Sequence, residues 1–409
     1  MRVYIFSPIP YSFLHQRPQK IADSFRARSI PVTYLEPCGF TEYLAGRKKG
    51  IVRLIVSSLG YHVLGILALV FPWLGRKRVN TFRRSAKQPD FLNISMPLVV
   101  PSNRFDSPIL ERLNASIYRQ VLRRKVFRDM KEDEDVAIVQ NPFWGAVLKT
   151  GDFHTICYDC IDEISLFSGR SSPERFAGYE RELLDLSDAV FVTARQLEEH
   201  VHSVRPDVPL HRIANGVDYD WFQERVRQGD TMSDLANVRR PIIGYAGILR
   251  SWMDYDLIGM VADTFTHASV VFVGPLDYAY RIESLRSRAN IFWLGRKEYR
   301  DVPCYINAFD VCVIPFLAGK IAQTTNPVKL YEYFALGKPV VSSWLAELEP
   351  YRDDGLVYMG ATREEFLAGV RAALAEEDPG ARKKRMSIAG QHTWSGVVDR
   401  MLSAVGGEG

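Results

Sequence analysis

The sequence contains few cysteines and shows no disulfide pattern. Five of its 409 residues are cysteine, and they are scattered along the chain at Cys38, Cys157, Cys160, Cys304 and Cys312. Small extracellular domains that depend on disulfides carry a much denser set. The sequence therefore excludes a disulfide scaffold and predicts a reduced, cytosolic chain. Cys157 and Cys160 have a Cys-x2-Cys spacing without a second pair, so we expect buried thiols and no bound metal.

We also expect no signal peptide, and no internal repeat or low-complexity run is visible. The apolar stretch at Met1–Pro8 is far too short for a signal peptide, and it predicts a strand that starts the fold. Hydrophobic residues make up 47% of the chain and charged residues 24%, which is typical of a globular protein with a real core and excludes a disordered chain.

Acidic residues are absent between Glu42 and Asp90, although this stretch is rich in lysine and arginine. A second basic run follows between Arg119 and Lys131. Such runs form a solvated basic face, a nucleic-acid surface or a surface for anionic lipid. We expect no nucleic acid, because no recognition motif accompanies the charge.

The basic stretch encloses Leu54–Leu74, which contains no charged residue and is long enough to cross a bilayer. Strands expected on both sides of it belong to one sheet, and this argues against crossing. We expect the segment to enter one leaflet, anchored by Trp73 near its end and by the flanking residues Arg53, Arg76, Lys77 and Arg78. The alternative is a helix buried in the core.

Short β-branched runs alternate with helical stretches along the whole chain, which predicts an α/β fold with parallel sheets. In the first half we expect strands at Val3–Ser7, Val32–Leu35, Val136–Gln140, Thr155–Asp159, Ala189–Thr193 and Arg212–Ala214. In the second half we expect them at Pro241–Tyr245, Val270–Val273, Ile291–Leu294, Val311–Ile314 and Val340–Ser343. A polar stretch divides the two halves. We therefore expect two Rossmann-like domains that face a central cleft: residues 1–222 with an insertion near 47–87, a linker at 223–240, and residues 241–409, whose last helix could pack back on the first domain.

The stretch Thr324–Val341 predicts a short helix with an exposed, anion-binding start. Thr325 or Asn326 is a suitable N-cap, with Pro327 at the first helical position and Gly337 at the C-terminal end. The backbone N–H groups at the start attract anions, and Lys329 adds a charge for phosphate. Glu332 lies along the same side and can accept hydrogen bonds from ribose hydroxyls. The alternative is an ordinary surface helix with a Lys–Glu pair.

This stretch, NPVKLYEYFALGKPVV, resembles the nucleotide-binding signature of retaining GT-B glycosyltransferases of the glycosyltransferase 4 type. It is especially similar to polysaccharide-assembly enzymes of the TuaH-like, teichuronic-acid group. Weaker matches occur in order along nearly the whole chain: FLHQRPQKIA, CYDCIDE, LSDAVFVTARQL, IANGVDYDWF and IIGYAGILRSWMDYDLI.

The resemblance implies roles for individual residues of the second domain. Glu332 would hold the ribose and Lys329 the diphosphate, while Arg250, after the turn that ends at Gly247, would reach the same phosphates. The backbone at Leu294–Arg296 would lie against the base. The donor-binding set that we expect is Gly247, Arg250, Arg296, Thr325, Asn326, Lys329 and Glu332.

The sequence departs from the family pattern in two places. The first Glu of the family's Glu-x7-Glu pattern is replaced by Thr324, which alters or removes a contact to the donor sugar. The glycine-rich turn after the first strand is replaced by Ser7–Pro10.

Carboxylates at the end of an expected strand of the first domain are candidates for the acceptor side. Asp159 or Asp162 could take a proton from an acceptor hydroxyl, or orient that hydroxyl. His15 and Arg17 could contact the acceptor or a phosphate. The alternatives are a helix-capping Asp and an ordinary loop histidine. Asp218-x-Asp220 and Asp254-x-Asp256 have the spacing of a metal-bound diphosphate site, but we interpret both as coincidence because GT-B enzymes do not need the metal.

These observations predict a metal-independent, retaining glycosyltransferase without a cofactor. It would take a UDP or GDP sugar as co-substrate and transfer the sugar to a lipid-linked saccharide during polysaccharide assembly. It would work in the cytoplasm at the inner face of the plasma membrane, held by anionic lipid. Two other classes remain open: a sugar-nucleotide epimerase of the same fold, and a nucleotide-sugar binding module without activity.

Overall fold

The structure is a computed structural model, and it describes residues 1–12, 14–36, 87–88, 90–95, 108–127, 134–163, 173–229, 232–276 and 285–406. The expected membrane segment and its anchors, Arg53, Trp73, Arg76, Lys77 and Arg78, lie outside the described residues. The chain divides into two units. Unit 1 contains residues 1–192, 197–212 and 401–409, and unit 2 contains residues 193–196 and 213–400. The chain thus passes into unit 2 at Ile213, whereas we expected the first domain to extend to residue 222.

Unit 1 is built on one sheet with the strand order β3-β4-β2-β1-β5-β6-β7-β8. Its strands are β1 (Val3–Phe6), β2 (Val32–Glu36), β3 (Lys87–Gln88), β4 (Phe91–Ser95), β5 (Val136–Val139), β6 (Thr155–Cys160), β7 (Ala189–Val192) and β8 (Leu210–Arg212). All pairs are parallel except β3 with β4.

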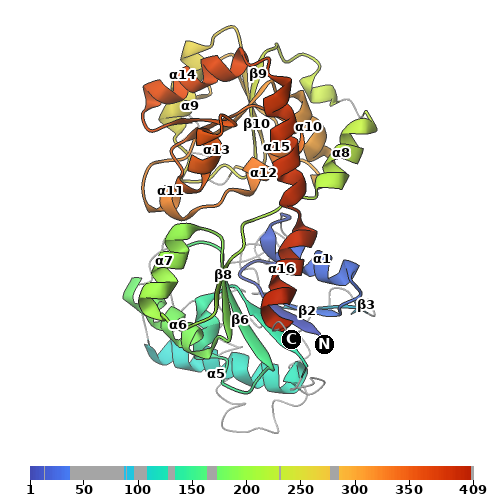
Figure 1. Ribbon diagram of the computed structural model, residues 1–409, viewed down its shortest axis with the longest axis vertical. Helices are drawn as coiled ribbons and strands as arrows, with labels where there is room; N and C mark the ends of the chain where they lie inside the picture. The colour runs from blue at the N-terminus through green and yellow to red at the C-terminus, as the bar shows by residue number, and fades with distance from the viewer. Residues whose placement is uncertain are drawn as a thin grey trace, which may run out of the picture. The chain divides into compact units, whose positions relative to one another are not determined.

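Side chains of the strands of unit 1 alternate between two helical layers. Tyr4 and Phe6 of β1 point to one layer, where their rings lie 5.1 Å from Phe153 and 4.8 Å from Trp144. This layer holds η3 (Pro142–Ala146), α5 (Pro108–Lys125) and α6 (Pro173–Leu186). Val3 points to the other layer, against α1 (Arg17–Ala27) and the end of α16 (Trp394–Gly406). A further helix, α7 (Arg195–Val204), follows β7 along the chain and is one of the green helices labelled in Figure 1.

Unit 2 is built on a fully parallel sheet with the order β11-β10-β9-β12-β13-β14. Its strands are β9 (Ile242–Ala246), β10 (Ser269–Val273), β11 (Ile291–Trp293), β12 (Val311–Ile314), β13 (Val340–Ser343) and β14 (Val357–Gly360). One layer of contacting helices contains α8 (Tyr219–Arg227), α10 (Val302–Ala308), α12 (Val328–Ala335) and α15 (Pro379–Gln391). The other contains α9 (Tyr255–Thr264) and α14 (Arg363–Leu374), while the short α11 (Lys320–Thr324) and α13 (Glu349–Asp353) lie after β12 and β13.

Unit 2 has the doubly wound Rossmann order 3-2-1-4-5-6, with its strands numbered within the unit. Unit 1 contains the same order in its parallel strands β4-β2-β1-β5-β6-β7, extended by β8 at one edge and by the antiparallel β3 at the other. The order reverses between β1 and β5 in unit 1 and between β9 and β12 in unit 2. Ligands of such sheets bind at the carboxyl ends of the strands beside this reversal. The described helices include none long and apolar enough to cross a membrane.

Candidate functional site

The strand reversal of unit 2 brings Lys329 of α12 onto the turn after β9. A Cβ atom added to Gly247 would lie 2.0 Å from Lys329 Cε and 2.6 Å from its Nζ, and Gly247 has a φ of +156°. Only glycine allows both this backbone and this approach. The ammonium also lies 5.6 Å from the centre of the Tyr245 ring. A cation is therefore held at the point where a doubly wound sheet binds anions.

Burial lowers the pKa of Lys329, and the nearby carboxylate of Glu332 opposes this shift. The ammonium is thus partly stripped of water, which strengthens its attraction for a phosphate. Glu332 and Arg250 both act on the buried Tyr245, whose pKa is raised by burial. The structure thus gathers Gly247, Arg250, Lys329 and Glu332 around the end of β9.

The start of α12 differs from the sequence prediction. The helix begins at Val328 with Pro327 at the N-cap position, and no side chain caps it. The expected cap, Asn326, is buried and bonded elsewhere: its Oδ1 accepts from the Asn215 backbone N–H at 3.0 Å, and its Nδ2 donates to the Tyr331 hydroxyl at 3.1 Å. The first backbone N–H groups of α12 are therefore left without a side-chain cap, as an anion-binding helix start requires.

The other residues expected on the donor side are less closely gathered. Thr325 is half-buried at the end of α11, and its backbone N–H donates to Ile321 O at 3.0 Å. Thr324, which replaces the first Glu of the family pattern, is buried and its hydroxyl donates to Lys320 O at 3.0 Å. Arg296 is exposed in the loop after β11. Arg250 is half-buried, with its guanidinium 5.4 Å from the Trp252 ring centre.

In unit 1 an ion pair between Arg17 and Asp159 lies at the carboxyl ends of the strands, beside the reversal of strand order. Arg17 Nη2 donates to Asp159 Oδ1 at 2.8 Å, and the two side chains are only 2% and 0% exposed. We expected Arg17 to contact a ligand, but its side chain is turned into the protein. Gln140, which directly follows β5, donates from Nε2 to Asp159 Oδ2 at 2.8 Å. Sequence reasoning missed Gln140, since a single Gln after a strand carries no distinctive signal.

The second candidate carboxylate of unit 1 lies in a different environment. Asp162 follows β6 and is half-buried. Burial raises its pKa to about 7, and the charge of Arg17 partly opposes this shift. A carboxyl group with a pKa near neutrality is suited to accept a proton. His15 is exposed in the loop before α1.

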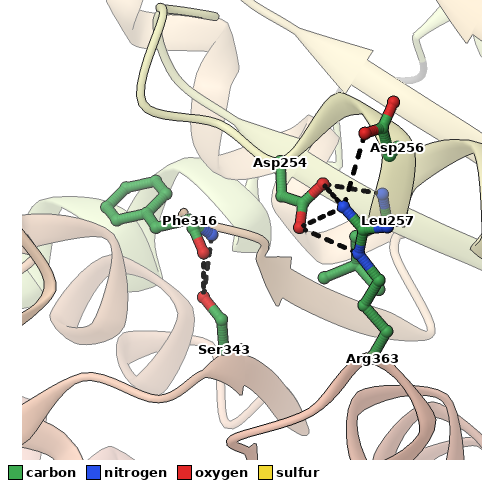
Figure 2. A network of polar contacts seen from close by, with 6 residues as sticks. All are labelled: Asp254, Asp256, Leu257, Phe316, Ser343 and Arg363. Atoms are coloured by element: carbon green, nitrogen blue, oxygen red, sulfur yellow. Dashed lines mark hydrogen bonds and ion pairs between the residues drawn. The ribbon is translucent and has the colours of Figure 1, made fainter. Parts of the chain in front are cut away.

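The Asp-x-Asp pair at Asp254 and Asp256 has a structural role (Figure 2). Asp254 caps α9 by accepting from the Leu257 backbone N–H at 2.9 Å. Arg363 of α14 donates to Asp254 Oδ1 at 3.1 Å and to Asp256 Oδ2 at 3.4 Å. Within the residues that the structure describes, no group of three or more His, Cys, Asp or Glu side chains could hold a metal ion. Cys157 and Cys160 are buried free thiols whose pKa values are raised by burial.

Two Rossmann-like units of this kind form the GT-B fold of glycosyltransferases, and the resemblance found in the sequence is confirmed. Residues 240–376, most of unit 2, match the model of the family described as Glycosyl transferases group 1.

Relatives of known name agree with this assignment. The chain is 23% identical over 267 residues to TuaH of Bacillus subtilis strain 168, described as a teichuronic acid biosynthesis glycosyltransferase. The match covers 61% of this chain and 66% of TuaH, slightly under two thirds of that protein.

Solved structures show the same fold over the whole chain. Trehalose-6-phosphate synthase OtsA superposes with a TM-score of 0.67 at 10% identity, covering 100% of both chains. HepE of Anabaena, solved with UDP, gives a TM-score of 0.63 at 12% identity and covers 99% of this chain and 100% of its own. The structure from E. coli bound with UDP-2-fluoro glucose gives 0.68 at 10% identity, with 98% of each chain covered. At these identities the likeness shows the fold alone.

Proposed function

We propose that the protein transfers a sugar from a nucleotide-diphosphate donor to a hydroxyl group of a saccharide during the assembly of a cell-surface polysaccharide. The observation that carries this proposal is the Lys329 ammonium against Gly247, beside the uncapped start of α12. The family match over residues 240–376 supports the sugar transfer, and the TuaH relative supports the polysaccharide. The UDP-bound HepE and the UDP-2-fluoro glucose complex support a nucleotide sugar as the donor.

On the donor side, the first backbone N–H groups of α12 and Lys329 would neutralise the diphosphate as it leaves. Stabilising this departing charge is the main electrostatic task of the transfer. Glu332 would accept hydrogen bonds from the ribose, and Arg250 would add a second cation. The nucleotide is UDP or GDP, and the exposed loop at Arg296 would lie near its base.

On the acceptor side, Asp162 is the better placed of the two carboxylates to act as the base. The acceptor oxygen would bond to the anomeric carbon of the donor on the face from which the diphosphate oxygen departs, while the bond from that carbon to the diphosphate oxygen breaks. The electron pair of the broken bond leaves with the diphosphate, and the acceptor's proton passes to Asp162. His15, exposed before α1, is a further candidate for contact with the acceptor.

The finer features come from the sequence. We propose that the anomeric configuration is retained and that no metal or cofactor is needed, as the resemblance implies. We propose a lipid-linked acceptor on the cytoplasmic face of the plasma membrane because of the apolar segment Leu54–Leu74 and its basic flanks.

The test is release of free nucleotide from a panel of UDP and GDP sugars, with and without a bacterial lipid extract. We expect release from one donor, stimulated by the extract, unchanged by EDTA, and lost in Lys329→Met. Lys383→Met, which removes an exposed lysine of α15, is the matched control and should keep full activity. Epimerised donor without release would establish the epimerase, and binding without turnover would establish a binding module. Either result would overturn the proposal.

A further inference from the structure

The ion pair between Arg17 and Asp159 is completed by more than one bond. Arg17 Nε donates to Asp159 Oδ2 at 3.0 Å, in addition to the bond from Nη2 to Oδ1 at 2.8 Å. Gln140 Nε2 adds a third donor. The carboxylate is 0% exposed, so a proton could reach it only after these bonds break and the site opens.

The pair joins three elements at the carboxyl edge of the sheet of unit 1. Arg17 is the first residue of α1, Asp159 lies in β6, and Gln140 follows β5. Charges so deeply buried are maintained only in well-matched, fully bonded pairs. Gln140 is itself 0% exposed, so all three side chains of this network are buried. The loop that ends at Arg17, and with it His15, is therefore fixed to β5 and β6.

Asp162 lies two residues beyond β6 and stays outside this network. Among the described residues no hydrogen bond to its carboxylate is present, and the charge that acts on it is that of Arg17. The other titratable groups nearby are Tyr158, Asp159 and Cys160 of β6 and Glu180 of α6. The charges of Glu180, Asp159 and Asp162 all act on the Cys160 thiol. Arg17 is thus the cation shared by the two carboxylates: it is bonded to Asp159 and acts on Asp162 through space.

We propose that Arg17 is a positioning residue of the transfer reaction: its buried ion pair keeps Asp159 out of acid–base chemistry and leaves Asp162 as the carboxylate that receives the acceptor's proton. The role of Asp162 toward an acceptor hydroxyl rests on the proposed function. The effect of Arg17 on the two carboxylates, which makes Asp159 structural and Asp162 reactive, involves residues of unit 1 alone.

The test is a charge series with two readouts on the full-length chain. The variants are Arg17→Gln, Asp159→Asn, the double variant R17Q/D159N, and Arg17→Lys, with Asp162→Asn for assignment. The first readout is the titration of Asp162 by ¹³C NMR of aspartate-labelled protein, and the second is the pH dependence of donor turnover. The double variant is neutral at both positions and keeps a hydrogen-bonding pair, so it serves if Arg17→Gln alone fails to fold.

The expected shifts have opposite signs. Loss of the cation in Arg17→Gln should raise the midpoint of Asp162, and loss of the anion in Asp159→Asn should lower it, each by about one pH unit. The double variant should return close to the wild-type midpoint. Arg17→Lys keeps the charge but loses the two-pronged geometry, so the midpoint should stay while kcat falls. The acidic limb of the turnover profile should follow the same order, with nucleotide affinity unchanged throughout.

If Arg17 has only a structural role, each variant should be less stable than the wild type but Asp162 should titrate at an unchanged pH. The same titration midpoint of Asp162 in all variants would therefore overturn the proposal. Turnover in Asp162→Asn at the wild-type level, or a deeper loss of turnover in Asp159→Asn, overturns it as well. If wild-type protein releases no nucleotide from any donor, the proposed function fails, while the NMR titration still decides whether Arg17 controls Asp162.

Discussion

At the scale of single residues, the proposed donor side contains a lysine, Lys329, whose burial disfavours its charged form. Burial lowers the pKa of Lys329, which means that the free protein holds its charge less well than an exposed lysine does. A bound diphosphate would supply the missing counter-charge. The charged form of such a lysine is disfavoured in the free protein and favoured beside a bound anion. Perturbed pKa values of this kind are typical of functional sites.

Replacing Lys329 by Met should weaken nucleotide binding at least tenfold, because a charge-assisted hydrogen bond contributes about 1.5–3 kcal/mol. The lowered pKa of Lys329 also sets the pH dependence of nucleotide binding. Lys329 is charged and binds the phosphates below its pKa, and this contribution to affinity is lost as the pH rises through that pKa. Calorimetry with UDP and GDP between neutral and alkaline pH should show this loss in the wild type and a flat profile in the variant. Identical profiles would show that Lys329 does not meet the phosphates.

Single residues also show where the sequence was sufficient and where it was not. Gly337 was expected at a left-handed C-terminal position of α12, and its φ is +66°. Asn326 was expected to cap the same helix, but its side chain is bonded to Asn215. A cap is a local preference, whereas Asn215 is 111 residues away, and no local rule anticipates that partner. The pair of Arg17 and Asp159, 142 residues apart, escaped prediction for the same reason.

At the scale of elements, strands with dense β-branched residues were predicted closely. The expected limits of β12 and β13 agree with those in the structure. Three described strands were missed: the two-residue β3, β4 with the sequence FLNIS, and β14 with the sequence VYMG. In the case of β4 and β14 the reason lies in the composition. Both are short and mix polar or flexible residues into the run, so their pairing is specified by neighbouring strands rather than by their own composition. The expected strand at Arg212–Ala214 was placed too late, since β8 covers Leu210–Arg212.

The segment before α12 should be fixed by its bond network, and this can be tested by comparing two asparagines. Asn326→Ala leaves the buried Asn215 N–H without its acceptor, which costs about 1–3 kcal/mol of the free energy of unfolding. Asn215→Ala removes the bond from Asn215 Nδ2 to Asn326 O at 2.7 Å but keeps the Asn215 backbone N–H paired with Asn326, and it should cost less. Hydrogen exchange at Asn215 should accelerate in Asn326→Ala. If exchange stays slow while nucleotide binding is lost, Asn326 is a direct ligand, as the sequence analysis expected.

At the scale of the whole molecule, the repeated alternation of strands and helices was enough to predict two doubly wound units. The same order of six parallel strands appears in both, β4-β2-β1-β5-β6-β7 in unit 1 and β11-β10-β9-β12-β13-β14 in unit 2, although the two sequences share no visible repeat. The passage between the units was harder to locate, since the chain leaves unit 1 at Arg212, before the polar stretch, and returns at Met401 within α16. A polar stretch in the sequence indicates exposed residues, whereas the boundary of a unit depends on which side chains pack together. The polar stretch and the boundary therefore need not coincide.

Association with a membrane is a property of the whole molecule that the sequence alone predicts. The segment Leu54–Leu74 would bury apolar surface, and each cation of its flanks would contribute about 1 kcal/mol near an anionic bilayer. Liposome sedimentation should therefore show binding that requires anionic lipid and weakens as salt is raised. Changing Arg76, Lys77 and Arg78 to Ser should reduce this binding and leave UDP or GDP affinity intact, because the nucleotide is assigned to unit 2.

Resistance to salt together with extraction by detergent alone would instead indicate a segment that crosses the bilayer. If the wild type binds no liposomes at any ionic strength, the segment belongs to the core and the lipid-linked acceptor loses its main support.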